Sequence, residues 1–451
     1  MAKTAMRRPS DFGELLRTAL PLAAVALISS FGVFADRFFL GRHSQSALAA
    51  VTPAAILANT FFCFIITTVS YTGTFIAHYY GGERHRQAVR AFAQGLWLSG
   101  LSIFALLAAL LIGNFFIRVS CPSDELMHAE LVYFNTTLPA QVFTTFSAVF
   151  IGYYTAERKA ALVAFAAIGG CLANLVLDPL LIFGWKFIPS LGISGAGIST
   201  IVSSALTTDI LAYPFLRRTC HWGKLRALLA FNRGLSLRIL HFAFPNAISY
   251  LIGTICFYTF VCALSRSGET ALAVSNVCLC VNGFYFAAID GLRQAQTALT
   301  GRCCGANDSP AANRVLINAF KSSGYVLIPV SIAYFLCGGQ IAAFFAKTGS
   351  DITAYLKIGG ILFGILVVND IFETIQALLT AALLGSGDTT FSMKSATFVQ
   401  LFFWMPLLAL SLALESSIVA LWLSLAAWRV LHVAILILRW RSGKWQHIRL
   451  T

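Results

Sequence analysis

Twelve long apolar segments follow one another along the chain, and they constrain its fold more than any other feature. About 20 apolar residues cross the hydrocarbon core of a bilayer as a helix, and every segment is long enough. Only 11% of the residues are charged and the mean hydropathy is +0.77, unlike a soluble domain with about 25% charged residues. The sequence therefore predicts an all-α, polytopic membrane protein. The segments are residues 15–39, 47–79, 91–117, 128–154, 161–184, 192–216, 236–264, 271–300, 312–338, 352–384, 393–414 and 416–439.

The positive charges lie mainly in alternate loops. Lys and Arg gather in the N-terminal arm, in loops 80–90, 155–160, 217–238 and 301–314, and in the C-terminal tail. By the positive-inside rule, these loops and both termini face the cytoplasm, which agrees with an even number of spans. Membrane topology thus accounts for the net charge of +14, and we expect no nucleic-acid partner.

A weak internal repeat divides the chain into two halves. At a constant offset of 224 residues, Pro21 matches Pro245, Gly81 matches Gly305 and Arg90 matches Arg314. We predict an N-terminal six-helix bundle over 1–220, a cytoplasmic basic linker over 221–238 and a C-terminal six-helix bundle over 239–451. The linker sequence HWGKLRALLAFNRG is suited to a short helix on the inner leaflet. Because six spans separate the copies, a pseudo-twofold axis along the membrane normal is expected to relate them, with a cavity between them.

Two polar residues stand out in the fifth segment. Asn174 and Asp178 lie one helical turn apart on one face, before a predicted helix break at Pro179 and a restart near Gly192. A carboxylate at the middle of a bilayer costs about 2.5 to 3.5 kcal/mol, so it normally faces a partner, an ion or water. With Asp36 of the first segment and the Thr200 hydroxyl, these groups form a candidate all-oxygen site for Na+ or a shared proton. Polar packing between helices is the alternative interpretation.

The tenth segment carries a second polar group. Asn369 and Glu373 are four residues apart and Gln376 follows one turn later, whereas Asp370 is expected to point elsewhere, toward an outer vestibule. In the eighth segment Asp290 and Arg293 are spaced for a local ion pair.

Arg429 and His432 share a face of the last segment, where packing or a partner carboxylate is favoured over a proton relay.

Motifs of the common enzyme classes are missing. The sequence has no phosphate-binding loop, no HExxH, no Gly-x-Ser-x-Gly and no metal-spaced Cys/His cluster. The eleven cysteines lie mostly within apolar segments and are expected to be reduced. We therefore expect neither enzymatic activity nor a cofactor.

Three stretches resemble the multidrug and toxic compound extrusion (MATE) family. They are ADRFFLGRHSQSALAA, NLVLDPLLIFG with LGISGAGIST, and ALLGSGDT. The resemblance covers nearly the whole chain and implies export of organic cations and drugs in exchange for Na+ or H+, by a monomer in the lipid of a prokaryotic inner membrane.

The resemblance also assigns roles to individual residues. It makes Asp36 the first-span acid, Asn174 with Asp178 the fifth-span cation site, Thr200 the sixth-span hydroxyl and Pro21 the proline of a bending first helix. Glu373 with Gln376 is similar to the NorM-type branch, in which this position is associated with cation binding, so the resemblance makes Glu373 a cation-binding residue. The seventh-span acid of that branch is missing from FPNAISYLIGTICF, whereas Asp290 is similar to the DinF-type branch. The mixture leaves open which ion is coupled and which bundle binds it. Secondary candidates for cation binding are Asn369, Asp370, Gln376 and Asp290.

Two other functions are weighed against export. A flippase for a lipid-linked oligosaccharide has a related helical arrangement, but its diphosphate substrate requires several Arg and Lys inside the spans, where the chain has chiefly Arg293 and Arg429. An intramembrane enzyme requires a nucleophile with a base in reach, and no such pair stands out.

Overall fold

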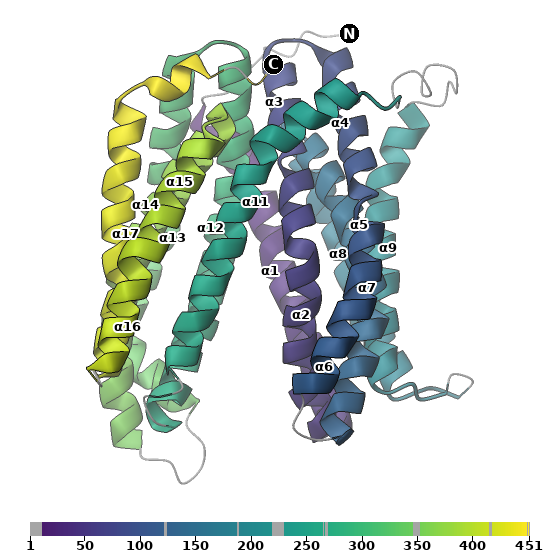
Figure 1. Cartoon of the computed structure of the whole chain (residues 1–451), viewed down its shortest axis with the longest axis vertical. Coiled ribbons are helices and arrows are strands. Elements are labelled where there is room, and N and C mark those ends of the chain that lie inside the picture. The colour runs from purple at the N-terminus through teal and green to yellow at the C-terminus, as the bar shows by residue number, and fades with distance from the viewer. Residues whose placement is uncertain are drawn as a thin grey trace. The chain divides into compact units, whose positions relative to one another are not determined.

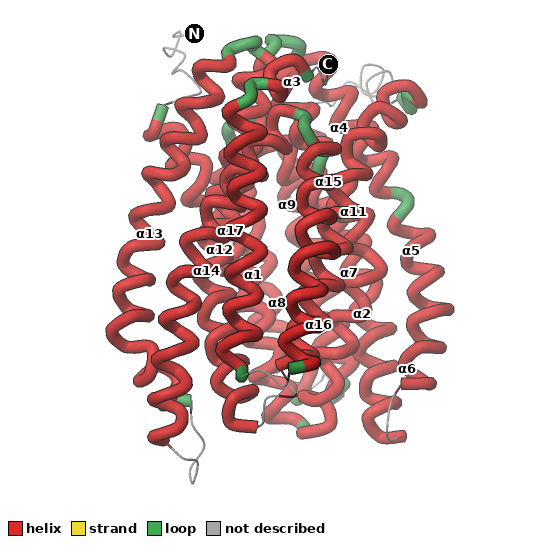
Figure 2. Tube along the Cα trace, turned by 60° about the vertical axis from the view of Figure 1, so that its left-hand side comes forward, coloured by secondary structure: helices red, strands yellow, loops and turns green. Residues whose placement is uncertain are grey.

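The computed structural model describes residues 11–120, 124–186, 189–218, 230–264, 266, 269–345, 352–414, 417–448 and 450. Throughout this part of the chain the regular elements are helices, and no strand occurs in it (Figure 2). The predicted all-α class is confirmed. Residues 221–229 of the predicted linker helix lie outside the described residues.

The helices follow the predicted segments closely. In the first half they are α1 Phe12–His43, α2 Gln45–Ser70, α3 Thr72–Gly81, α4 His85–Ser99, α5 Ser102–Ala108, α6 Asn114–Ser120, α7 Asp124–Ala156, α8 Ala160–Ile182 and α9 Ile193–Arg218. In the second half they are α11 Arg233–Leu264, α12 Glu269–Gly305, α13 Ser309–Phe344, α14 Ile352–Ser386, α15 Thr389–Val399, α16 Met405–Ala413 and α17 Ile418–Arg441. Short π-helical turns, Ala109–Gly113 and Gln400–Trp404, join α5 to α6 and α15 to α16.

Eleven helical stretches of the described chain are long and apolar enough to cross a membrane. The remaining predicted span is α7, which has 33 residues and is long enough but less apolar. Between residues 135 and 147 it carries seven Asn, Thr, Gln and Ser side chains. The Thr and Ser hydroxyls of this stretch form hydrogen bonds inside the protein. For example, the Thr137 hydroxyl donates to a carbonyl of its own helix, and the Ser147 hydroxyl is 2.8 Å from the Thr208 hydroxyl of α9. These polar side chains are tolerated in α7 because the helix packs between α2 and α9 and exposes little of its surface to lipid.

The chain forms two compact units. The N-terminal unit is Ala24–Ala247, and the C-terminal unit comprises the described residues up to Ala23 together with Ile248–Leu450. In the N-terminal unit α7 lies against α2 and α9, around a core that includes Phe62, Phe134 and Ile182. In the C-terminal unit α14 packs against α12, α13 and α17 (Figure 1), around a core that includes Phe363 and Trp422.

The helices α1 and α11 pass from one unit to the other at equivalent positions. Each crosses two residues after its proline, Pro21 in α1 and Pro245 in α11, and each has 32 residues. The 224-residue repeat therefore extends to the boundaries of the units. The first turns of α1 are held in the C-terminal unit by α12, where a Cβ added at Gly291 would collide with the backbone of Leu22 and Ala23.

Two boundaries differ from the predicted ones. The helix α8 continues through Pro179 to Ile182, and the proline carbonyl accepts a bond from the Phe183 N–H. The proline costs little there because it lies in the last turn, and the chain restarts at Ile193. The helix α11 begins at Arg233, within the predicted linker, because Asn232 caps it by accepting a bond from the Leu235 N–H at 3.0 Å.

Substitution of Gly73 tests the closest helix crossing in the N-terminal unit. A Cβ at Gly73 of α3 would lie 2.9 Å from the Cα of Gly152 in α7, and backbone cannot move aside as a side chain can. We expect Gly73→Val to destabilise the protein by about 1 to 3 kcal/mol, measured as a lower melting temperature in detergent. The control is Gly360→Val in α14, where nothing lies within 4 Å of an added Cβ. Equal losses for the two variants would contradict the crossing.

Candidate functional site

The predicted acid of the fifth span lies at the interface of α8 and α9. Asp178 is completely buried and Asn174 is 6% exposed. The amide nitrogen of Asn174 is 3.4 Å from Asp178 Oδ1, as expected for residues one turn apart. A buried carboxylate with a neutral amide as its helical neighbour still requires a further partner.

Small residues of α9 allow the two helices to approach closely. Gly195, Ser199, Ser203 and Thr207 recur every four residues on one face. A Cβ at Gly195 would lie 2.6 Å from the backbone of Leu181, and one at Gly170 would lie 3.0 Å from the Ser203 carbonyl. This close packing brings the Ser199 hydroxyl to Asp178 Oδ1, to which it donates, and within 3.3 Å of the Asn174 amide.

The structure places Ser199, and not Thr200, beside the carboxylate. Thr200 donates its hydroxyl to the Ala196 carbonyl of its own helix at 2.8 Å. The physical reason is helical phase: Thr200 is about 100° away from the face that meets α8. The hydroxyl of α9 that contacts Asp178 is therefore that of Ser199, one residue before the predicted Thr200.

The first-span acid joins this group from α1. Along the helix, the Ile28 carbonyl is 3.7 Å from Cys171 Sγ, and a Cβ at Gly32 would be 4.0 Å from Asn174 Oδ1. One turn further, the Asp36 carboxyl lies close enough to interact with both Asn174 and Asp178. The structure therefore brings Asp36, Asn174 and Asp178 together, as predicted.

Two oxygens of this group lack a donor. Asp36 Oδ1 and Asp178 Oδ2 are buried and accept no hydrogen bond from any described residue. Two carboxylates in contact repel each other unless a proton or a cation lies between them. The oxygen ligands available here, two carboxylates and an amide oxygen, suit a hard monovalent cation or a shared proton. Tyr133 of α7, which is 5% exposed, lies close enough to interact with both carboxyls.

A second buried polar group lies in the C-terminal unit. Asn369 Nδ2 is 3.2 Å from Glu373 Oε2, the predicted pairing, and 3.3 Å from Asp370 Oδ1. Asp370 does not point elsewhere as predicted: it is 2% exposed and accepts a bond of 2.6 Å from Asn282 of α12. The reason is that α14 is surrounded by α12, α13 and α17, so successive residues on it are both inside.

The remaining predicted residues of this unit have separate positions. Gln376 has a buried Oε1 with no donor among the described residues. Asp290 forms the predicted ion pair with Arg293 at 2.6 Å and also accepts a bond from Gln294. Arg429 has a partner carboxylate, Glu373, at 3.0 Å.

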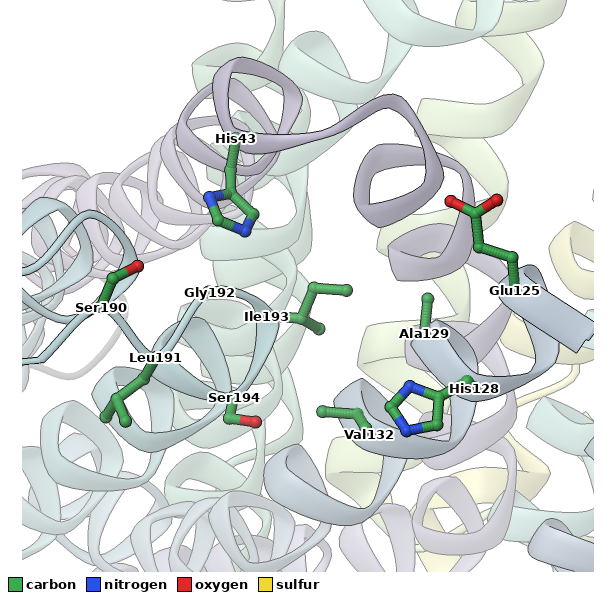
Figure 3. Close-up of a pocket in the computed structure, with 10 residues that line it drawn as sticks. All are labelled: His43, Glu125, His128, Ala129, Val132, Ser190, Leu191, Gly192, Ile193 and Ser194. Atoms are coloured by element: carbon green, nitrogen blue, oxygen red, sulfur yellow. The ribbon is translucent and has the colours of Figure 1, made fainter.

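A pocket of about 440 Å³ opens at one end of the N-terminal unit (Figure 3). His43 and His128 both face it, with Glu125 at its edge. The pocket lies about 10 Å along α1 from Asp36, because seven residues at 1.5 Å each separate Asp36 from His43. It is therefore distinct from the carboxylate site. The lining residues are His43, Glu125, His128, Ala129, Val132, Ser190, Leu191, Gly192, Ile193 and Ser194.

The sequence interpretation missed Ser199, Tyr133 and Asn282. For Ser199 a signal exists, since it belongs to the four-residue series of small side chains that marks the packed face of α9. Tyr133 and Asn282 come from helices whose position beside the acids depends on tertiary packing, and no local pattern identifies them.

The comparisons with known proteins give matches over most of the chain. The MatE family model matches residues 21–180 and 245–410. Proteins named probable multidrug resistance protein NorM from Brucella suis and Thermotoga maritima are 24% and 23% identical over 440 and 446 residues, covering 94% and 96% of this chain and 92% and 93% of theirs. A solved MOP superfamily transporter from Pyrococcus furiosus has 18% identity and a TM-score of 0.88, covering 99% of this chain and 100% of its own. The structural likeness shows the same fold.

Ser199 and Thr200 provide a matched pair for testing the site. Ser199→Ala removes the hydroxyl that donates to Asp178, and we expect a loss of about 1 to 2 kcal/mol in stability. Thr200→Val removes a hydroxyl that bonds only its own helix, and we expect a change below about 0.5 kcal/mol. The measurement is the melting temperature in detergent. An equal shift in both variants would show that the Ser199 contact contributes nothing particular.

Proposed function

Because the chain belongs to the MatE family, we propose that it is a Na+- or H+-coupled antiporter that exports organic cations and drugs from the cytoplasm. The observation that carries the proposal is the contact between Asp36 and Asp178, with one buried oxygen of each carboxyl left without a donor. Relatives named as probable multidrug resistance proteins over nearly the full length support the substrate class.

Coupling follows from the charge of this pair. With both carboxyls ionised, repulsion and the cost of charge in a low dielectric favour a hydrated, open arrangement of α1 and α8. A Na+ ion or a proton arriving from outside neutralises part of that charge and allows the two helices to close together. The closed arrangement then releases the drug outward.

The available driving force is sufficient for such coupling. At an assumed 100 mV, one charge that crosses the membrane yields about 2.3 kcal/mol. That energy corresponds to a concentration ratio of roughly fiftyfold, since about 1.4 kcal/mol is a factor of ten.

We propose that α1 transmits the change through a soft segment around Pro21. Proline leaves the carbonyl of the preceding turn without its donor and permits a bend. On either side, the Thr18, Ser29 and Ser30 hydroxyls bond carbonyls of their own helix, a pattern that also weakens helices. Asp36 lies fifteen residues after Pro21, so a bend at the proline displaces the carboxyl.

The proposed organisation is that of a multi-pass protein of a prokaryotic inner membrane, acting as a monomer in lipid, with a bundle on either side of the basic linker. Both termini are proposed to be cytoplasmic. In support, α1 begins and α17 ends at the same end of the C-terminal unit (Figure 1).

The rival function, a flippase for a lipid-linked oligosaccharide, has less support. It requires basic side chains that are free to bind a diphosphate. Arg293 is paired with Asp290 at 2.6 Å, and Arg429 with Glu373 at 3.0 Å. These are the two intramembrane arginines that the rival would use.

The acid pair is tested by neutral isosteres. We expect Asp36→Asn and Asp178→Asn each to abolish ethidium efflux from vesicles under imposed Na+ or H+ gradients, because neither amide can be switched by a cation. Protein in the membrane should stay at the wild-type level. Asp209→Asn, at an exposed acid of α9, is the control and should retain efflux. Efflux that persists in both site variants would reject the mechanism, and the gradient that drives the wild type identifies the ion.

The hinge is tested by Pro21→Ala. Alanine restores the missing backbone bond and favours a straight helix by up to about 3 kcal/mol, so we expect efflux to fall by about tenfold or more. The control is Pro329→Ala, at an exposed position within α13. Unchanged efflux in the Pro21 variant, measured at equal protein levels, would argue against bending at this point.

A further inference from the structure

An ion pair between α14 and α17 lies inside the C-terminal unit. Arg429 Nη2 is 3.0 Å from Glu373 Oε1, and each side chain is only 12% exposed. The guanidinium also lies over the Trp428 ring, with Cζ 5.2 Å from the ring centroid. Arginine remains charged at any physiological pH, and its planar group matches a carboxylate. Glu373 therefore has a permanent positive partner supplied by the chain itself.

Amide side chains connect this ion pair to a second acid. Asn369 donates to Glu373 Oε2 and to Asp370 Oδ1, and Asn282 also donates to Asp370 Oδ1. Both oxygens of Glu373 are thus engaged. Asp370 Oδ2, in contrast, is buried and accepts no hydrogen bond from the described residues. One acid of the cluster is saturated and the other retains an open oxygen.

Among the described residues, no buried Lys or Arg forms an ion pair with the acid pair of the N-terminal unit. Within the described ranges, the ion pairs formed by Lys and Arg include neither Asp36 nor Asp178. Arg37, the neighbour of Asp36, is exposed. Two carboxylates that form no ion pair need their compensating positive charge from a proton or a cation in solution. In the C-terminal cluster, the charge of one arginine already compensates one of the two carboxylates.

Resting on the proposed ion-coupled export, we propose that Arg429 is a built-in cation for Glu373. It withholds Glu373 from the coupling ion and leaves Asp370 as the acid of this cluster that is open to one. A Na+ ion at Glu373 would have to displace the guanidinium or bear its repulsion. Arg429 is thus a specificity-determining residue, because it sets how many coupling ions this unit takes up.

The test is a mutant cycle on the full-length protein. The variants are Arg429→Met, which removes the charge, Arg429→Lys, which keeps it, and the double variant Glu373→Gln/Arg429→Met. Glutamine retains an oxygen that can accept the Asn369 bond. The readouts are ethidium efflux from proteoliposomes and the number of Na+ ions plus protons taken up by purified protein at saturation.

Arg429→Met should lower efflux by about tenfold or more, because it leaves Glu373 buried without its partner. Arg429→Lys keeps the charge but loses the planar group, so its efflux should lie between those of Arg429→Met and the wild type. The double variant should recover to within about threefold of wild type and take up the same number of cations, since the two changes remove one internal pair. A double variant as inactive as Arg429→Met, or one that takes up one cation fewer than wild type, would overturn the proposal.

A wild-type protein that moves dye under neither gradient would refute the proposed function. The pairing of Arg429 with Glu373 would still be tested by the stability of the variants. The melting temperature in detergent should fall in Arg429→Met and return in the double variant. A double variant that melts as low as Arg429→Met would overturn the role of Arg429 independently of transport.

Discussion

Charge buried in a low dielectric is the constraint on which this structure depends. A carboxylate removed from water is costly unless a donor, a counter-ion or a proton compensates it, and the protein buries Asp178 and Asp370 almost completely. Around each acid the helices are arranged to supply part of that compensation. Ser199 and Asn174 supply it to Asp178, and Asn282 and Asn369 supply it to Asp370.

The two units meet this constraint in different ways. In the N-terminal unit a second acid, Asp36, adds to the cost, and we propose that a proton or a cation from solution compensates the pair. In the C-terminal unit a guanidinium from α17 meets the second acid, and the cluster carries its own compensation. The two units therefore do not have equivalent electrostatics, although α1 and α11 cross between them at equivalent positions.

The fold was more predictable from the sequence than the site. The lengths of the apolar segments were enough to locate the spans, because every helix that crosses the hydrocarbon core needs a long apolar stretch. Asp36 and Asp178 were also predictable, since acids inside apolar segments are few and costly and normally face a partner, an ion or water. Asn174 was predictable because it lies one helical turn from Asp178. Helical phase was not resolved well enough to choose between Ser199 and Thr200. Partners such as Asn282 depend on which helices become neighbours, and Asp370 was misplaced because α14 is enclosed on several sides.

The docking of the first turns of α1 onto α12 has a consequence for biosynthesis. Leu22 and Ala23 emerge early from the ribosome, whereas Gly291, against which they pack, is made more than 250 residues later. The start of the protein remains in the bilayer without its final neighbour while six further predicted spans are inserted. The N-terminal unit is continuous in sequence, whereas the C-terminal unit combines the start of the chain with Ile248–Leu450, so that unit is expected to complete its folding only near the end of synthesis.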